Sequence, residues 1–260
     1  MNTYRTIDDI RTALEPRRDG TVGLVPTMGA LHAGHLSLIA AAREECSTVV
    51  MSLFVNPTQF GVAADLDAYP RDEARDLAVA AEAGVDLVFA PTVEQMYPAG
   101  FQTWVDVAEL GSILEGEYRP GHFRGVATVC LKLFTIVRPD RVYFGQKDAQ
   151  QVAVLRRMIT DLALDLELRD LPTVRDADGL ALSSRNGRLS ASERERALAL
   201  PRALATRDPE RARELLDGLE VDYVEVAPFD PPVLAAAIHV GSTRLIDNVP
   251  LIHVEPQEAS

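Results

Sequence analysis

Cysteine is scarce in this chain of 260 residues, and long apolar runs are missing. Its two cysteines, Cys46 and Cys130, lie in apolar or helical segments without CxxC spacing or nearby histidines, which predicts buried free thiols. The most apolar run, 126–137, is interrupted by Lys132 and is shorter than the roughly 20 residues of a membrane helix. We therefore expect no disulfide framework and no membrane partner.

Positive charge is also in short supply, because 26 Lys and Arg residues face 39 Asp and Glu residues, a formal net charge of -13. Such a field repels nucleic acid, which we exclude as a partner. Asp8, Asp9 and Glu15 stand where a secretion signal would be basic and then apolar, so we expect a cytoplasmic protein. Lys132 and Lys147 are the only lysines, and each is a candidate for binding an anion against the general field.

Apolar runs bounded by turns alternate with segments of helical period up to residue 172, which is typical of parallel strands joined by crossover helices. The expected strands are 21–26, 47–55, 85–91 and 140–145, with 21–26 as the first, and the expected helices are 35–45, 70–84, 122–137 and 148–162. This alternation predicts an α/β fold with a doubly wound parallel sheet over residues 1–172.

The pattern changes after Pro172, which predicts a smaller second domain of α+β type over residues 173–260. Its expected elements are a hairpin at 176–190, helices at 192–205 and 209–218, a strand at 221–227, a short helix at 233–240 and an extended segment at 243–254.

Two histidines stand where the first predicted strand meets the next helix. The segment VPTMGALHAGH places His32 and His35 at a strand's carboxyl end, where open parallel sheets bind ligands and a helix N-terminus attracts anions. Positions i and i+3 share a helix face, so both imidazoles can reach one phosphate, and Gly29 and Gly34 permit close backbone approach. An isolated HxxH is more often a surface or capping pair, but this context favours a phosphate site.

The segment resembles the HxGH signature of the nucleotidyltransferase superfamily. Further motifs follow in order along nearly the whole chain, namely FVNPTQF, DLDAYPR, RPGHFRGV, YFGQKDAQQ, PTVRDADGLALSSRN and STRLIDN. With PTMGALHAGH, they resemble the pantothenate synthetase family. The resemblance implies a Rossmann-like N-terminal domain, a C-terminal lid, a homodimer, and ATP-dependent condensation of pantoate with β-alanine through a pantoyl-adenylate, with release of AMP and pyrophosphate.

The resemblance also assigns residues to the substrates. The expected ATP-binding residues are Met28, Gly29, His32, Gly34, His35, Gly145, Gln146, Lys147, Asp148, Val174, Leu182, Ser183, Ser184 and Arg185. Among these, His35, His32 and Lys147 are expected to be catalytic, while Mg²⁺ accompanies ATP and no metal-ligand set is assigned. Gln59, Gln151 and Asn56 are expected to bind pantoate, because neutral amides can donate to a carboxylate and accept from a hydroxyl.

The sequence leaves the roles of two motif residues undecided, and it departs from the family pattern in one region and at one site residue. Arg119 and His122 could approach β-alanine or the ribose, or could cap the helix that starts there. Between residues 200 and 221 the chain is shorter than the family pattern, which predicts the loss of a helical segment from the lid. Leu182 stands where the family commonly has methionine, and this exchange keeps an apolar residue.

Two other functions are compatible with these residues. One is a different HxGH nucleotidyltransferase, which transfers AMP to a phosphate instead of activating a carboxylate. The other is a regulatory protein that binds nucleotide without catalysis, although the intact His32, His35, Lys147 and Arg185 argue against it.

Overall fold

The structure is a computed structural model that describes residues 1–61 and 66–251. The chain forms two compact units, of which the first comprises Met1–Gly145 and Gln150–Pro172 and the second comprises Gln146–Ala149 and Thr173–Ser260. The motif DLDAYPR begins at residue 65 and the expected extended segment reaches residue 254, so these two ends lie outside the described residues.

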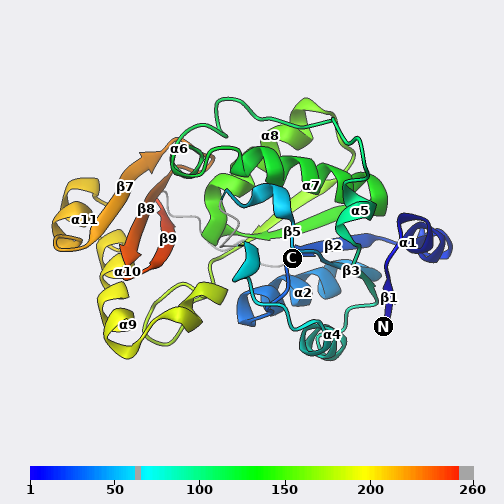
Figure 1. Cartoon of the computed structure of the whole chain (residues 1–260), viewed down its shortest axis with the longest axis horizontal. Helices are drawn as coiled ribbons and strands as arrows, with labels where there is room; N and C mark the ends of the chain where they lie inside the picture. Colours follow the sequence, from blue (N-terminus) through cyan, green and yellow to red (C-terminus); the bar gives the residue numbers. More distant parts are fainter. Residues whose placement is uncertain (62–65, 252–260) are drawn as a thin grey trace. The chain divides into compact units, whose positions relative to one another are not determined.

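The first unit is built on a parallel sheet (Figure 1). Its strands are β1 (Asn2–Tyr4), β2 (Val22–Thr27), β3 (Thr48–Leu53), β4 (Leu87–Phe89), β5 (Arg141–Gly145) and β6 (Glu167–Leu171). They lie in the order β1-β4-β3-β2-β5-β6, and each neighbouring pair is parallel. The order reverses between β2 and β5, which makes the carboxyl ends of these two strands the switch point where open α/β sheets bind ligands.

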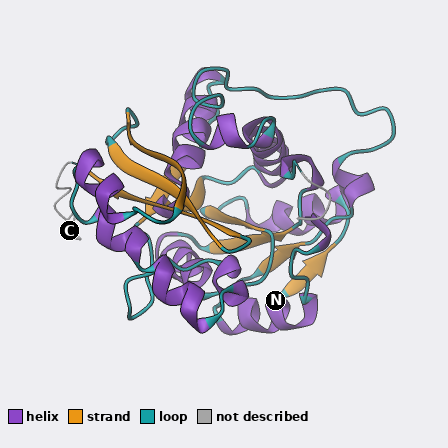
Figure 2. Ribbon diagram, turned by 60° about the vertical axis from the view of Figure 1, so that its left-hand side comes forward, coloured by secondary structure: helices purple, strands orange, loops and turns teal. Residues whose placement is uncertain are grey.

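Helices cover both faces of this sheet (Figure 2). They are α1 (Ile7–Leu14), α2 (Ala33–Glu45), α4 (Glu73–Glu82), α5 (Val93–Met96), α6 (Glu115–Tyr118), α7 (His122–Val137) and α8 (Ala149–Asp161), with the short 3₁₀ helices η1 (Glu15–Arg17) and η2 (Pro57–Gln59). Because side chains alternate along a strand, Val49 and Met51 of β3 pack with α2 and α4, whereas Val50 packs with α1 and α7. The expected doubly wound, Rossmann-like α/β fold is confirmed.

The second unit contains an antiparallel sheet in the order β7-β8-β9. Its elements are η3 (Gln146–Asp148), η4 (Ser184–Arg188), α9 (Ala191–Ala197), α10 (Ala199–Leu204), α11 (Pro209–Leu215), β7 (Glu220–Ala227), β8 (Val233–Val240) and β9 (Thr243–Pro250). Leu200 and Leu204 of α10 pack against Leu234 and Ile238 of β8, so the helices bury one face of this sheet. This confirms the smaller α+β part of the predicted fold.

The predicted helix at 233–240 is wrong, because this segment is the strand β8. It lies between β7 and β9, so it is the central strand and is buried on both faces. A strand buried on both faces is largely apolar, and β8 is apolar except at His239. Its sequence therefore lacks the alternation that distinguishes a strand from a buried helix. The three consecutive alanines, Ala235, Ala236 and Ala237, add a helical propensity that the sheet overrides.

Other differences concern short or polar elements. The strand β1 and the helix α1 precede the segment predicted as the first strand, and β6 follows α8 where no strand is predicted. β6 has the sequence ELRDL, whose charged residues hide the strand pattern. The predicted hairpin at 176–190 is reduced to an isolated antiparallel bridge between Arg175 and Ala181, and residues 184–188 form η4.

Both cysteines are buried free thiols, as the sequence predicts. Burial raises the pKa of Cys130 to about 12, so this thiol stays protonated and unreactive near neutral pH. Within residues 1–61 and 66–251, no helix combines the length and the apolar character needed to cross a membrane.

Candidate active site

The loop after β2 brings the two predicted histidines together. His32 is the N-cap of α2, and its Nδ1 accepts a hydrogen bond from the backbone N–H of Gly34 at 3.1 Å. The backbone N–H of His32 donates in turn to Nδ1 of His35 at 3.3 Å, and the two ring centroids lie 4.2 Å apart. Because each Nδ1 accepts, the proton of each neutral ring lies on Nε2, so both imidazoles present an Nε2–H donor. A Cβ on residue 34 would lie 2.9 Å from Cε1 of His32, which explains glycine there.

A buried carboxylate shapes the same loop. The backbone N–H groups of Ala30 and Leu31 donate to the two oxygens of Asp76 at 2.8 and 2.9 Å, and Asp76 is only 2% exposed. Gly29 has a φ of +83°, and a Cβ at this position would lie 2.7 Å from Oδ2 of Asp76. Sequence reasoning missed Asp76, because an aspartate in an otherwise polar stretch of helix α4 gives no signal of a partner 46 residues away.

Asn56 and Gln59 meet at the 3₁₀ turn η2. Nδ2 of Asn56 donates to Oε1 of Gln59 at 3.0 Å and to the carbonyl oxygen of Gly125 at 3.2 Å. The hydroxyl of Tyr97 donates to Oδ1 of Asn56 at 2.8 Å, and burial raises the pKa of Tyr97, which keeps this donor protonated. Both polar atoms of Asn56 are thus engaged within the protein. Oε1 of Gln59 accepts the bond from Asn56 with one of its two lone pairs, and Nε2 is the donor end of this side chain.

Arg119 and His122, which the sequence left open, hold the backbone of Gln59. Nδ1 of His122 donates to the carbonyl oxygen of Gln59 at 2.9 Å. Nη1 of Arg119 donates to Nε2 of His122 at 3.2 Å and lies 3.7 Å from Oε2 of Glu115. His122 is the first residue of α7, so this chain of contacts connects the start of that helix to η2.

The two neighbouring glutamines of α8 have different surroundings. Gln150 is 5% exposed, and its Nε2 donates to the carbonyl oxygens of Leu110 and Ile113 at 2.8 and 2.7 Å. Its Oε1 accepts from the backbone N–H of Glu115 at 3.0 Å, so Gln150 holds the loop before α6. The predicted site residue Gln151 is half-buried on the same helix.

A pocket in the second unit is lined by three cationic residues, Lys147, Arg185 and Arg244, and by the hydroxyl-bearing Ser183. Asn186 and Asp247 also line it. Oγ of Ser183 caps η4 by accepting from the backbone N–H of Arg185 at 3.2 Å. Lysine, arginine and hydroxyl groups on one pocket wall are suited to a polyphosphate.

The remaining predicted ATP residues lie on segments that adjoin these groups. The carbonyl oxygen of Val174 accepts from the backbone N–H of Leu182 at 2.9 Å, which closes the loop that leads to Ser183 and to the half-buried Ser184. Of the full set, Met28, Gly29, His32, Gly34, His35 and Gly145 belong to the first unit, and Gln146, Lys147, Asp148, Val174, Leu182, Ser183, Ser184 and Arg185 belong to the second.

A candidate carboxylate for a metal is that of Asp148, next in sequence to the pocket residue Lys147; its side chain is 49% exposed and lies 3.9 Å from Nζ of Lys147. No cluster of three or more His, Cys, Asp or Glu side chains suited to a metal ion occurs in the part of the chain that the structure describes. Mg²⁺ that arrives with a nucleotide needs only one or two carboxylates, since phosphates and waters complete its coordination. Asp148 fits that requirement.

Comparison with known proteins identifies the family of this chain. A family model described as pantoate-beta-alanine ligase matches residues 2–250. The chain belongs to the pantoate–β-alanine ligase family. Among its relatives in this family, the pantothenate synthetase of Pelotomaculum thermopropionicum is 50% identical over 276 residues, which include 95% of this chain and 98% of the relative. That of Corynebacterium glutamicum is 52% identical over 261 residues, with 89% of this chain and 94% of the relative covered.

Solved structures of the pantoate–β-alanine ligase family have the same fold. The pantothenate synthetase of Thermus thermophilus matches with a TM-score of 0.91 at 45% identity, over 96% of this chain and 99% of that chain. The pantoate-beta-alanine ligase of Francisella tularensis matches with a TM-score of 0.87 at 34% identity, over 96% and 98% of the two chains. The latter was solved in complex with "Beta-gamma ATP and Beta-alanine".

Proposed function

We propose that this protein condenses pantoate with β-alanine in an ATP-dependent reaction that passes through a pantoyl-adenylate. The family match over residues 2–250 is the observation that carries the proposal. It is supported by the Francisella relative, whose structure contains an ATP compound and β-alanine.

In the first step, the pantoate carboxylate attacks the α-phosphorus of ATP and pyrophosphate leaves. Negative charge grows on the α-phosphoryl oxygens and on the leaving group, so fixed donors aimed at these atoms lower the barrier. The Nε2–H groups of His32 and His35 supply such donors, because backbone N–H groups occupy Nδ1 of both rings. We assign both histidines to stabilisation of the phosphoryl oxygens and the leaving pyrophosphate.

For pantoate, we propose that Gln59 and Gln151 bind the carboxylate and the hydroxyls. Gln59 offers Nε2 as a donor, and Gln151 is half-buried, whereas the neighbouring Gln150 makes three hydrogen bonds within the protein. Asn56 has protein partners at both polar atoms, so we assign it to orienting Gln59. Arg119 and His122 support this arrangement by holding the Gln59 carbonyl.

For ATP, we propose that Lys147, Ser183, Ser184 and Arg185 bind the phosphates and that the backbone of Val174 contacts adenine. The cationic pocket of the second unit supports this assignment. Mg²⁺ bound to ATP would be held by the phosphates and Asp148, and it would neutralise charge on the leaving pyrophosphate.

In the second step, the neutral amine of β-alanine attacks the acyl carbon, AMP leaves, and the amide nitrogen loses a proton. Water must be excluded, because the mixed anhydride hydrolyses readily. We propose that residues 1–172 bind nucleotide and pantoate and that residues 173–260 act as a lid. The 276-residue alignment with the Pelotomaculum enzyme is longer than this chain, so this chain has gaps against that relative, and we propose that the missing residues belong to the lid.

We further propose that the enzyme works in the cytoplasm as a homodimer. The family resemblance is the basis for the dimer. The scarcity of cysteine, with both thiols free, is compatible with a reducing compartment.

An assay of partial reactions tests the proposed function. ATP–pyrophosphate exchange should require pantoate, and AMP and pantothenate should form in equal amounts once β-alanine is added. Exchange that does not depend on pantoate would instead indicate another nucleotidyltransferase. ATP binding without AMP release would indicate a regulatory protein.

A further inference from the structure

The strand β9 holds the turn that carries Lys147. Nδ2 of Asn248 donates to the carbonyl oxygens of Gln146 and Lys147, at 2.8 and 2.9 Å. Asn248 is only 6% exposed, so these bonds are shielded from water. An asparagine amide nitrogen carries two N–H donors, and the two carbonyls use both of them.

The position of Asn248 is itself held tightly. Its backbone N–H donates to Oδ1 of Asp247 at 2.8 Å, and Asp247 pairs with Arg175 at 2.6 Å. Arg175 also donates to the carbonyl oxygens of Gly179 and Asn248, at 3.2 and 3.4 Å. Asp247 is 3% exposed, and a buried carboxylate with a two-pronged arginine partner is among the most rigid polar contacts in proteins.

Two consecutive residues of β9 therefore anchor two separate segments of the candidate ATP site. Successive side chains of a strand point to opposite faces, and Asp247 and Asn248 are opposite Ala236 and Ala235 of β8, respectively. Through Arg175, Asp247 holds the loop that leads to Ser183 and Arg185, while Asn248 holds η3.

We propose that Asn248 is a positioning residue that sets the backbone of Lys147, so that the ammonium group meets the ATP phosphates. This inference rests on the proposed ATP-binding role of Lys147. Asn248 acts through the main chain of η3 and needs no contact with the nucleotide. Lys147 lies in η3, two residues after β5 ends at Gly145. The position of a long, flexible side chain is better defined when its backbone is fixed.

The variant Asn248→Asp tests this proposal, because it keeps the shape of the side chain and removes both donors. It also adds a negative charge, so Asn248→Ser, which adds none, is measured beside it. We expect ATP affinity, measured by calorimetry with a β,γ-nonhydrolysable analogue, to fall about 10-fold to 100-fold, as expected when one charge-assisted contact between Lys147 and a phosphate is lost. In pantoate-dependent exchange, the KM for ATP should rise while the KM for pantoate stays within about twofold. Asn248→Ser, which keeps one donor, should fall between the wild type and Asn248→Asp, and it replaces the aspartate variant if that variant does not fold.

The decisive measurement is a double-mutant cycle with Lys147→Ala. If Asn248 acts through Lys147, Asn248→Asp or Asn248→Ser should weaken ATP binding less than twofold in the Lys147→Ala background. An equal loss in both backgrounds, or an equal rise in the KM for pantoate, would overturn the proposal in favour of a general structural role. Glu225→Gln is the control, because Glu225 is an exposed residue of β7 in the same sheet and does not line the pocket, and we expect unchanged kinetics.

The failure of the proposed function can be told apart from the failure of this inference. Binding of the analogue requires neither pantoate nor β-alanine. A wild-type protein that binds the analogue but shows no pantoate-dependent exchange contradicts the proposed ligase activity, while the variants still decide the role of Asn248. A wild-type protein that does not bind the analogue overturns both.

Discussion

At the scale of the residue, the histidine pair shows how the backbone selects the chemical form of a side chain. The N–H groups of Gly34 and His32 donate to the two Nδ1 atoms and so leave the proton of each ring on Nε2. His32 also serves as the N-cap of α2, so it has a structural role and a proposed chemical role at once. A test of its chemistry must therefore separate the donor from the cap.

We predict that His32→Ala and His35→Ala each slow adenylate formation by about 10²-fold to 10³-fold, the usual cost of losing one oxyanion donor. Single-turnover measurement of adenylate formation, and of the reaction of isolated adenylate with β-alanine, checks this. His32→Asn keeps both a capping oxygen and an N–H donor. It should therefore retain more activity than His32→Ala and a stability close to that of the wild type. Equal losses in the two steps would contradict the assignment of these histidines to the first step.

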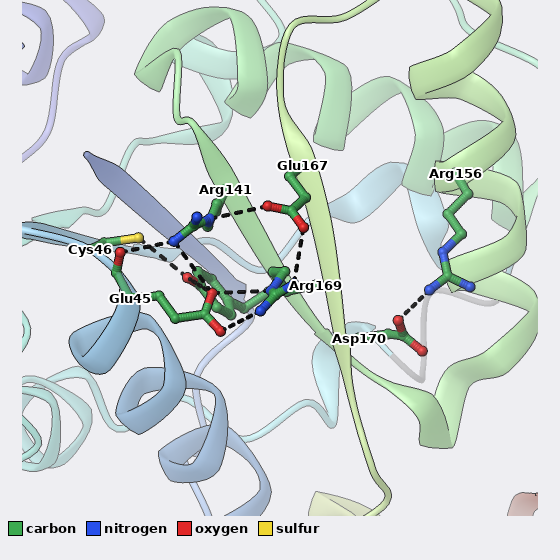
Figure 3. Close-up of polar contacts among 8 residues, drawn as sticks. Glu45, Cys46, Arg141, Arg156, Glu167, Arg169 and Asp170 are labelled. Atoms are coloured by element: carbon green, nitrogen blue, oxygen red, sulfur yellow. Dashed lines mark hydrogen bonds and ion pairs between the residues drawn. The ribbon is translucent and has the colours of Figure 1, made fainter. Parts of the chain in front are cut away.

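At the scale of the element, α2 is held at both ends. Its first turn carries the histidine pair, and its last residue, Glu45, accepts from Arg169 at 2.7 Å and from the hydroxyl of Tyr143 at 3.0 Å (Figure 3). Arg141 lies 3.7 Å from Glu45 and donates to Glu167 at 3.2 Å. Arg141 begins β5 and Glu167 begins β6, so this network ties α2 to the amino ends of two strands. Hydrogen bonding to Glu45 raises the pKa of Arg169, and the same contact lowers that of Glu45.

We predict that Glu45→Gln lowers the free energy of unfolding by about 1 kcal/mol at pH 7, a value discounted because Arg169 is 40% exposed. Since the folded pKa of Glu45 lies below the unfolded value of about 4.3, the stabilisation is complete above that pH and is lost as pH falls through the folded pKa. Denaturant unfolding between pH 3 and 7 measures this. Glu73→Gln breaks an exposed pair with Arg5 and should cost less. A loss from Glu45→Gln that does not change with pH would exclude the ionic origin.

At the scale of the whole molecule, the residues proposed to bind pantoate and those of the cationic pocket belong to different units of the chain. The residues assigned to pantoate belong to the first unit, while the cationic pocket with Lys147 and Arg185 belongs to the second. The formal net charge of -13 opposes a polyanion at long range, so we expect binding of ATP to depend on local cations such as Lys147 and Arg185.

We predict that Lys147 is needed for thermal stabilisation of the protein by an ATP analogue and that Gln59 is needed for thermal stabilisation by pantoate. An ATP analogue at 100 times its Kd should stabilise the wild type by about 2.7 kcal/mol. At the same concentration, Lys147→Ala should lose most of that stabilisation, while Gln59→Ala should keep it and lose stabilisation by pantoate. Thermal shift titrations of the three proteins with each ligand provide the measurement. If Gln59→Ala loses stabilisation by the ATP analogue as completely as Lys147→Ala does, the assignment of the two ligands to separate residues is wrong.

The sequence by itself determined the family, the alternation of strands and helices, and the motifs that carry the candidate site, because these depend on local order along the chain. Tertiary structure alone decided that 233–240 is a central strand, since β7 and β9 pair with its two edges and α10 packs on one of its faces. It also revealed Asp76 beneath the histidine loop and Asn248 beneath Lys147, whose partners lie 46 and 101 residues away. Such contacts have no local pattern, because they arise only when distant segments pack together.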